Sequence, residues 1–425
     1  MADNPPKPIL IIGAGLTGLL LAQHLRKSGI PFQIFERDAD YTSRGVGWGL
    51  TLHWCLPALR SLLPEELVQR LPETYVDRTA VADGKPSTFP FYNLSTGELK
   101  LAAPAMPEAL RIRVSRERFR RLLASGIDIQ WNKAASTFDS GDESITVGFD
   151  DGSSAIGSLL VACDGGNSRV RRFLFPQHEK FEIPLRLMGM KIEYTPEQLA
   201  PMQKLDPIFL QGSASENGTY VFFSMLDAPG NTPNSPSDKY VCQVGASWPV
   251  RAGFFGRPEP IEVPATNEGR IELFKTFAAT WAEPFRSLAG AVTETTDVKG
   301  MQVYDWPPPK GLRGKGRIAL VGDALHPMAM YRGEGANHAI VDVLDLVERV
   351  ITPHLASHQS TASNETLRAA LNGYEDEVVS RSRPGVLASR QACLDAHRWG
   401  RIDAKSPLVS RRVMKLEFEE EDLVY

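Results

Sequence analysis

The stretch "PILIIGAGLTGLLLAQHL", residues 8–25, decides the fold of this chain. Residues 8–13 are an almost continuous apolar run, which is typical of a buried parallel strand. Residues 16–28 carry apolar positions at helical spacing, and residues 31–36, "PFQIFE", predict a second strand. Together these segments predict a βαβ unit, and hence an α/β fold with a parallel sheet.

Three glycines occupy the turn between the first strand and the helix. Gly13, Gly15 and Gly18 spell GxGxxG, a pattern that permits a tight turn, close approach of a pyrophosphate and close packing of helix on strand. The N-terminus of the helix offers free N–H groups to the phosphates. Glu36 ends the second strand, where a carboxylate can accept hydrogen bonds from ribose hydroxyls. This combination predicts a dinucleotide-binding site.

The rest of the chain alternates between strand-like and helical segments. Residues 114–125 predict a basic amphipathic helix, and "SLLVAC" and "GRIALV" read as further buried strands. Residues 180–300 carry strand-like runs such as "GTYVFFSML" and "KYVCQVGASW", which predict a β-rich second domain. Beyond Asn337 the pattern is mostly helical to about residue 398.

Composition limits the possible partners and compartment. The 425 residues carry a formal net charge of -4 without a basic block, so we expect no nucleic-acid partner. Gln23 and His24 interrupt the first apolar run, and no basic leader precedes it, so we expect a cytoplasmic protein without a membrane partner. The 4 cysteines are widely spaced, which predicts buried free thiols. We expect no metal site, because Asp323 and His326 have no further ligands nearby.

Two further motifs specify the kind of dinucleotide. "DGGNSRVR", residues 164–171, fits DGxxSxxR, and "GDALHP", residues 322–327, precedes "GEGAN", residues 333–337. In this order with GxGxxG, the motifs resemble the FAD-dependent aromatic hydroxylase (class A flavoprotein monooxygenase) family. The segments "RGVGWGL" at 44–50, "VSRERF" at 114–119 and "YEDEVVSRSRPGVLASRQACLDAH" at 374–397 are also similar to that family. The resemblance thus covers nearly the whole chain and is weakest in the middle domain.

The resemblance implies an α/β architecture with a Rossmann-like FAD-binding domain, an embedded β-sheet substrate domain and C-terminal helices. The domain boundaries that we predict are 1–75, 105–178 and 312–350 for the FAD-binding domain, 76–104 and 179–311 for the substrate domain, and 351–425 for the C-terminal helical region.

The resemblance also implies contacts to FAD. Asp323 would bind the ribitol chain, and Glu36 would bind the adenosine ribose. Backbone N–H groups of Gly335, Ala336 and Asn337 would lie beside the flavin pyrimidine ring, where a helix N-terminus stabilises the negative charge of reduced flavin. The remaining implied FAD contacts are Gly13, Gly15, Gly18, Arg37, Arg44, Gly49, Arg116 and Asp164.

By the same resemblance, NADPH is a transient co-substrate that reduces FAD, since the chain has no second GxGxxG. The reduced flavin would then use O2 to insert one oxygen atom into a phenolic or heteroaromatic small molecule, in secondary or catabolic metabolism. The chain would act as a monomer or a homodimer.

Candidates for catalytic roles are few. They are His326, Tyr220 and His53, and the alternatives are a structural hydrogen bond for His326, a core tyrosine for Tyr220 and ordinary packing for His53. Arg186 is a candidate partner for an anionic substrate, with an ordinary surface arginine as the alternative.

The sequence departs from the family in one loop. Met330 and Glu334 stand where the family has proline and glutamine, and Arg332 beside Glu334 predicts an exposed ion pair that contributes little stability.

Other reactions stay open, because a fold does not set its chemistry: epoxidation, Baeyer–Villiger oxidation, ring opening, or flavin oxidase or reductase activity. A halogenase is disfavoured by the absence of a WxWxIP motif. A non-enzymatic flavoprotein is favoured only by Met330 and Glu334.

Overall fold

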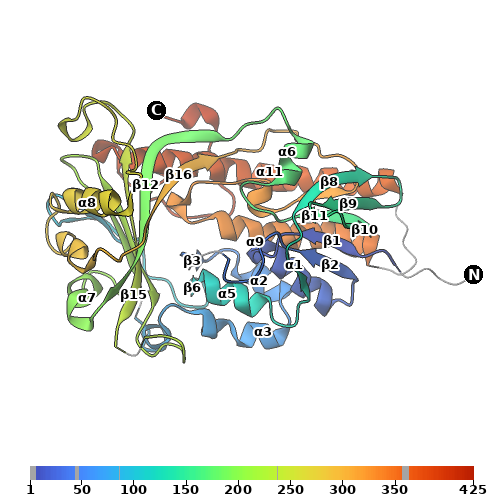
Figure 1. The fold of residues 1–425 in the computed structure, drawn as a ribbon, viewed down its shortest axis with the longest axis horizontal. Helices are drawn as coiled ribbons and strands as arrows, with labels where there is room; N and C mark the ends of the chain where they lie inside the picture. The colour runs from blue at the N-terminus through green and yellow to red at the C-terminus, as the bar shows by residue number, and fades with distance from the viewer. Residues whose placement is uncertain (1–5, 44–46, 86, 237, 357–362) are drawn as a thin grey trace, which may run out of the picture.

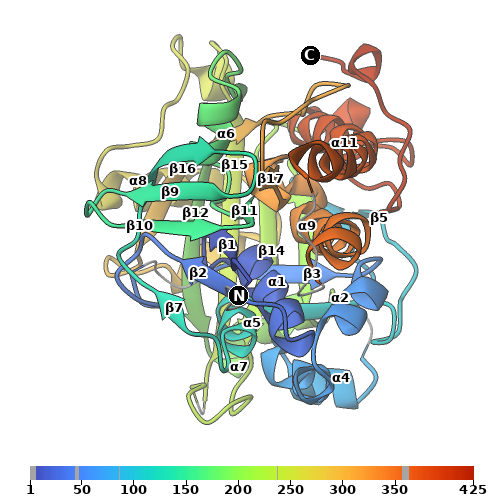
Figure 2. The same ribbon diagram turned by 90° about the vertical axis from the view of Figure 1, so that its right-hand side faces the viewer.

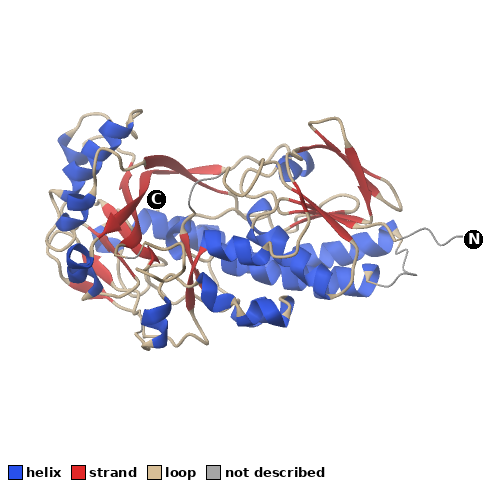
Figure 3. Cartoon of the chain, turned by 60° about the horizontal axis from the view of Figure 1, so that its bottom comes forward, coloured by secondary structure: helices blue, strands red, loops and turns tan. Residues whose placement is uncertain are grey.

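The computed structural model describes residues 6–43, 47–85, 87–236, 238–356 and 363–425. Figure 1 shows an elongated molecule with a large twisted sheet at one end and a unit of strands and helices, which contains β1, α1 and β2, at the other. Long helices run lengthwise between the strands at the two ends (Figure 3).

A parallel sheet organises the first of these regions. Its five strands, in spatial order, are β17 (Ile318–Leu320), β11 (Leu159–Ala162), β1 (Ile9–Ile12), β2 (Phe32–Phe35) and β7 (Ile129–Gln130). Every residue of β1 and β11 is buried, because other elements cover both faces of the sheet. Helix α1 (Leu16–Lys27) joins β1 to β2, which confirms the predicted βαβ unit and the Rossmann-like α/β fold.

Two smaller sheets accompany the parallel sheet. An antiparallel sheet of β8 (Ala135–Ser140), β9 (Ile145–Phe149) and β10 (Ser154–Gly157) packs against it, with the rings of Phe35 and Phe149 4.7 Å apart. A two-stranded sheet pairs β3 (Gly49–Leu52) with β6 (Ile112–Ser115). The helix predicted for residues 114–125 begins only at Arg116, as α5 (Arg116–Leu123), because Val114 and Ser115 belong to β6.

The other end of the molecule is a seven-stranded sheet. Helices α7 (Pro196–Gln203) and α8 (Asn267–Ala278) lie on its outer side (Figure 1). Trp248, Phe274 and Trp281 fill the space beneath these helices and are fully buried. The strands, in spatial order, are β16 (Val298–Asp305), β12 (Phe181–Tyr194), β15 (Tyr240–Pro249), β14 (Tyr220–Asp227), β13 (Phe209–Ser213), β4 (Phe91–Asn93) and β5 (Leu99–Leu101).

One long helix connects the two sheets. Helix α11 (Asn364–Asp395) runs beside α9 (Gly335–Leu346), as Figure 2 shows. Early in α11, Tyr374 donates a hydrogen bond to the carbonyl oxygen of Leu320 in β17, at 3.0 Å. Near its end, Arg390 donates through Nε to Asp305 of β16, at 2.8 Å. The C-terminal helices therefore pack into both cores, while the domain boundaries that we give stay predictions.

The short helices α2 (Leu56–Leu62), α3 (Glu65–Gln69) and α4 (Arg78–Ala82) connect β3 to β4, and α6 (Arg169–Leu174) follows β11. All 4 cysteines are buried and free, as predicted. Within the described ranges, the search for a helix with the length and apolar character of a membrane span finds none.

The first and third glycines of the GxGxxG turn have no room for a side chain. Gly13 has φ +104, a conformation that strongly favours glycine, and a Cβ there would lie 2.4 Å from the carbonyl oxygen of Cys163. A Cβ on Gly18 would lie 2.0 Å from the carbonyl oxygen of Gly13. The backbone of α1 therefore rests directly on the end of β1.

We predict that Gly18→Ala destabilises the protein by roughly 1–3 kcal/mol, because the methyl group forces α1 away from β1. The measurement is the urea midpoint of the apoprotein. Gly373→Ala is the matched control, because a Cβ on this glycine of α11 would meet no atom within 4 Å. Alanine favours a helix interior, so the control should be as stable as the unchanged protein or slightly more stable. Equal urea midpoints for Gly18→Ala and the unchanged protein would show that a methyl group fits beside Gly13, and would contradict this prediction.

Candidate active site

Four predicted FAD-binding positions lie at one edge of the parallel sheet. Gly13 follows β1, Glu36 follows β2, and Asp164 comes shortly after β11. Asp323 comes shortly after β17. Because the strands are parallel, all four positions meet at the carboxyl edge, where open α/β sheets bind their ligands.

The glycine turn leaves open space in front of helix α1. Gly15 is the N-cap residue, and no side chain caps the helix. A Cβ on Gly15 would meet no protein atom within 4 Å, in contrast to the crowded Gly13 and Gly18. Uncapped N–H groups that face open space fit a phosphate group, so the turn can accommodate the pyrophosphate of a dinucleotide.

Glu36 is buried behind the glycine turn. Its Oε2 accepts a hydrogen bond from the N–H of Ala14 at 2.8 Å, and its Oε1 accepts one from the N–H of Asp38 at 3.1 Å. Arg37, also a predicted FAD contact, is exposed and lies 3.9 Å from a carboxylate oxygen of Asp38. Glu36 thus supports the turn, and its predicted bond to ribose stays a prediction.

Helix α5 brings two arginines to the same region. Arg116 packs against Gly47, where a Cβ would lie 3.3 Å from a terminal guanidinium nitrogen. Arg120, one helical turn later, donates through Nε to the carbonyl oxygen of Ala14 at 2.8 Å. We did not predict Arg120, although its spacing from Arg116 places both on one face of the helix. Arg44, the remaining predicted arginine, lies outside the described residues.

The DGxxSxxR motif ties two loops together. Ser168 caps α6 by accepting the N–H of Arg171 at 2.9 Å. The guanidinium of Arg171 donates to the carbonyl oxygens of Gly166 at 2.6 Å, Ala324 at 2.8 Å and Asp323 at 3.1 Å. The arginine of the motif therefore joins the loop after β11 to the loop after β17.

Asp164 of the same motif is half-buried. Its Oδ2 accepts the N–H of Arg169 at 2.8 Å, and its Oδ1 is buried without a hydrogen-bond partner among the described residues. Burial raises the pKa of Asp164, although its hydrogen bond with Ser168 and those with backbone N–H groups act in the opposite direction. The free oxygen is compatible with a polar ligand group at this edge.

Asp323 combines accessibility with close surroundings. It lies in a 3-10 turn, η4 (Gly322–Ala324), and its side chain is exposed. The surrounding protein nevertheless raises the pKa of its carboxyl group, because burial outweighs the charges of His326, Arg116 and Arg171, which act to lower the pKa. A Cβ on Gly335, at the start of α9, would be 3.7 Å from Oδ1 of Asp323.

A buried charge network supports this loop from behind. His326 Nε2 lies 2.6 Å from Asp342 Oδ2, which also accepts the N–H of Gly322 at 2.9 Å. Arg381 donates to Oδ1 of Asp342 at 2.9 Å. Burial alone would raise the pKa of Asp342, but the His326 charge and hydrogen bond and the Arg381 charge together lower it. His326 has no exposed surface, so what it makes here is a structural contact, and its catalytic role stays a prediction.

The N-terminus of α9 is fastened to β3. Asn337 donates through Nδ2 to the carbonyl oxygen of Thr51 at 2.9 Å, and its Oδ1 accepts the N–H of His53 at 2.9 Å. At the other end of β3, the N–H of Gly49 donates to Oε1 of Gln243 in β15, at 2.8 Å. Strand β3 therefore lies between the FAD-binding edge and the seven-stranded sheet, with the half-buried Gly335 beside it.

The loop between the segments "GDALHP" (322–327) and "GEGAN" (333–337) differs from our expectation. Arg332 and Glu334 do form an ion pair, at 2.6 Å, but the pair is buried and not exposed. Arg332 also donates to Oγ of Ser410, at 3.1 Å, and Trp54 Nε1 donates to Glu334 at 3.3 Å. The pair is buried because the C-terminal segment packs over this loop. Met330, in contrast, is exposed.

In the described part of the chain, no hydrogen bond joins any two of the three catalytic candidates, His53, Tyr220 and His326. Only His53 keeps accessible surface; burial and the positive charges of Arg412 and Arg111 lower its pKa to about 3. Tyr220 is buried and donates to Gln211 Oε1 at 2.9 Å, and burial raises its pKa.

Arg186, the candidate partner for an anionic substrate, is already neutralised. It forms ion pairs with Glu262 at 2.6 Å and Glu182 at 3.1 Å. This pairing favours the alternative of a structural arginine at the edge of the sheet.

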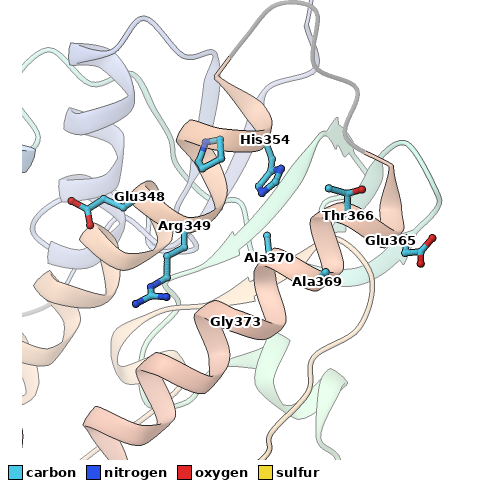
Figure 4. Close-up of a pocket in the computed structure, with 9 residues that line it drawn as sticks. Glu348, Arg349, His354, Glu365, Thr366, Ala369, Ala370 and Gly373 are labelled. Atoms are coloured by element: carbon cyan, nitrogen blue, oxygen red, sulfur yellow. The ribbon is translucent and has the colours of Figure 1, made fainter.

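A pocket elsewhere on the molecule is separate from this site. Figure 4 shows it between the residues that follow α9 and the start of α11, lined by Glu348, Arg349 and His354, among others. Arg368 of α11 donates to the carbonyl oxygen of Gly316, just before β17, at 3.2 Å. The start of α11, which lines the pocket on one side, is thus held near the amino end of β17. In the part of the chain that is described, no group of side chains could hold a metal ion.

Comparisons with known proteins agree with this geometry. A family model described as an NAD(P)-binding Rossmann-like domain matches residues 11–46. The "Probable FAD-dependent monooxygenase" of Arthroderma benhamiae is 45% identical over 436 residues, covering 100% of this chain and 99% of that protein. The FAD-dependent monooxygenase dbaB of Emericella nidulans is 39% identical over 356 residues, covering 82% of this chain and 88% of that protein.

Solved structures share the fold. The structure of 2,6-dihydroxypyridine-3-hydroxylase from Arthrobacter nicotinovorans matches with a TM-score of 0.74 and 18% identity, covering 98% of this chain and 100% of that chain. Because the 45% identity to the first relative extends over the whole chain, this chain belongs to the FAD-dependent monooxygenases, and FAD is its cofactor.

Proposed function

We propose that this enzyme uses NADPH and O2 to insert one oxygen atom into a phenolic or heteroaromatic small molecule, in secondary or catabolic metabolism. The observation that carries the proposal is the position of β3, which Asn337 fastens to the start of α9 and Gln243 fastens to the seven-stranded sheet. A flavin bound along the carboxyl edge would therefore meet the substrate sheet at β3. The hydroxylase from Arthrobacter nicotinovorans, whose name describes a heteroaromatic substrate, supports this substrate class.

FAD, when bound, supplies the activation of O2, and the chain supplies binding and orientation. The uncapped N-terminus of α1 would hold the pyrophosphate, and Asp323 would bind the ribitol chain. The N-terminus of α9 would stabilise negative charge on the flavin ring. His53 and Tyr220 are uncharged at neutral pH, because burial lowers the pKa of the first and raises that of the second. They would orient a substrate through hydrogen bonds.

The proposal is tested by NADPH consumption in air with the FAD-loaded protein, across phenols, indoles and hydroxypyridines, with product mass measured in parallel. We expect faster NADPH consumption with a substrate and a product heavier by one oxygen atom. Consumption that yields only hydrogen peroxide with every compound would favour the oxidase alternative. A product whose ring is expanded or epoxidised would favour Baeyer–Villiger oxidation or epoxidation.

Asp323→Ala should weaken FAD binding by roughly tenfold or more, because it removes an accessible carboxylate that would accept ribitol hydroxyl hydrogens. The measurement is the Kd for FAD, from titration of the apoprotein. Asp376→Ala is the control, since Asp376 is exposed and pairs with the exposed Arg313. An unchanged Kd in Asp323→Ala would refute this assignment.

His53→Gln should leave the shape of the pH profile of kcat/KM unchanged between about pH 5 and pH 8. The pKa of His53 is lowered to about 3, so the imidazole is neutral throughout this range and gains a proton only in stronger acid. The level of activity can fall if His53 orients the substrate. The lowered pKa of His53 would be contradicted if the unchanged protein showed a titration near the ordinary histidine pKa in its profile of kcat/KM against pH, and if this titration disappeared in the variant.

A further inference from the structure

Two arginines lie at the start of β6. In the β3–β6 pairing, Arg113 lies opposite Thr51. Arg111 directly precedes the strand, and its guanidinium lies over the ring of Phe89. Arg113 donates to Oγ1 of Thr51 at 2.8 Å and to Oγ of Ser224 in β14 at 2.6 Å. Its guanidinium therefore lies at the junction between the FAD-binding edge and the substrate sheet.

The charge of Arg113 has no counter-ion within the described part of the chain. Its terminal guanidinium nitrogens donate to two neutral hydroxyls, and its buried Nε has no hydrogen-bond partner among the described residues. Burial lowers the pKa of Arg113 to about 9, although the residue keeps some accessible surface. Burying a cation without a counter-charge is costly, so this arrangement favours an anionic ligand.

Other buried arginines show the contrast. Arg390 pairs with Asp305, Arg332 with Glu334, and Arg381 with Asp342. Arg412 pairs with no acid of the described ranges, but it directs its N–H groups to backbone carbonyl oxygens, including that of Leu408 at 2.7 Å. Arg113, by comparison, donates to two neutral hydroxyls and to no carboxylate or carbonyl oxygen of the described residues.

Aromatic rings line the same junction. The guanidinium of Arg111 lies 4.2 Å from the ring centroid of Phe89, which is 4.1 Å from that of Phe209. Phe222 follows at 5.3 Å from Phe209, and the guanidinium of Arg113 lies 5.7 Å from the Phe222 ring. Phe89 and Phe222 keep accessible surface.

The backbone of Phe89 is unusual. It has φ +50, in the left-handed region that a bulky side chain rarely adopts. Strained residues of this kind gather at ligand sites, where the surrounding structure holds them in place. This backbone conformation places an aromatic ring beside Arg111, which carries a second positive charge. Burial lowers the pKa of Arg111 to about 10, and the negative charge of Asp206 partly offsets this effect.

We propose that Arg113, assisted by Arg111, binds an anionic group of the substrate, a carboxylate or an ionised phenol, while the aromatic ring of the substrate lies against Phe222 and Phe89. This inference rests on the proposed function, because it specifies the substrate class of the same site. The substrate would then be an acidic aromatic compound and not a neutral one. An anionic reduced flavin offers the same chemistry to Arg113, and the experiment separates the two.

The test is calorimetric titration of the FAD-loaded protein with salicylate and with methyl salicylate, its neutral ester. We expect the unchanged protein to bind the carboxylate more tightly than the ester. Arg113→Met should lose this preference, with salicylate binding weakened by roughly tenfold or more and ester binding little changed. Arg186→Met is the matched control, because the charge of Arg186 is already paired with Glu262 and Glu182.

A preference for the ester or no preference in the unchanged protein would overturn the proposal. So would a preference that persists in Arg113→Met. A lowered flavin midpoint potential in Arg113→Met with unchanged salicylate binding would assign the charge to the flavin instead. If Arg113→Met fails to fold, Arg111→Met provides the same comparison, with a smaller loss expected. Absence of oxygenated product with retained salicylate preference would overturn the proposed function and leave the anion subsite standing.

Discussion

The contact between the backbones of Gly13 and Gly18 is the constraint on which the nucleotide site depends. A Cβ on Gly18 would lie 2.0 Å from the carbonyl oxygen of Gly13, so α1 begins directly above the end of β1. The helix N-terminus is thereby aimed at the carboxyl edge of the sheet. Parallel pairing then brings Glu36, Asp164 and Asp323 to the same edge from three other strands.

A second set of contacts relates this edge to the seven-stranded sheet. Asn337 and Gln243 hold the two ends of β3, and Arg113 reaches from β6 to Ser224. Helix α11 fastens both sheets through Tyr374 and the buried Arg390 pair. Because these are side-chain bonds between separate elements, the carboxyl edge of the parallel sheet and the seven-stranded sheet are held in one orientation. Orientation of this kind is what an oxygen-transfer enzyme requires, since the cofactor carries the chemistry.

The features that could be predicted are those set by neighbouring residues. The βαβ unit follows from periodicity within residues 8–36, and the crowding of Gly18 against Gly13 follows from their place in one turn. The ion pair of Arg332 and Glu334 was also predictable from adjacency, but its burial was not. That burial depends on residues near the C-terminus, which fold over the loop.

Sequence by itself determined the α/β fold and the glycine turn, because strand periodicity and turn geometry are local properties of the chain. The order of its motifs indicated the cofactor through resemblance to a known family. Only the tertiary structure decided which side chains meet. It placed Arg120 on the glycine turn and His326 beneath the loop after β17. Among the described residues, it also left Arg113 without a counter-ion at the junction of two sheets, since its surroundings come from segments far apart in the chain. Burial and charge balance are sums over such distant neighbours, so no short stretch of sequence contains them.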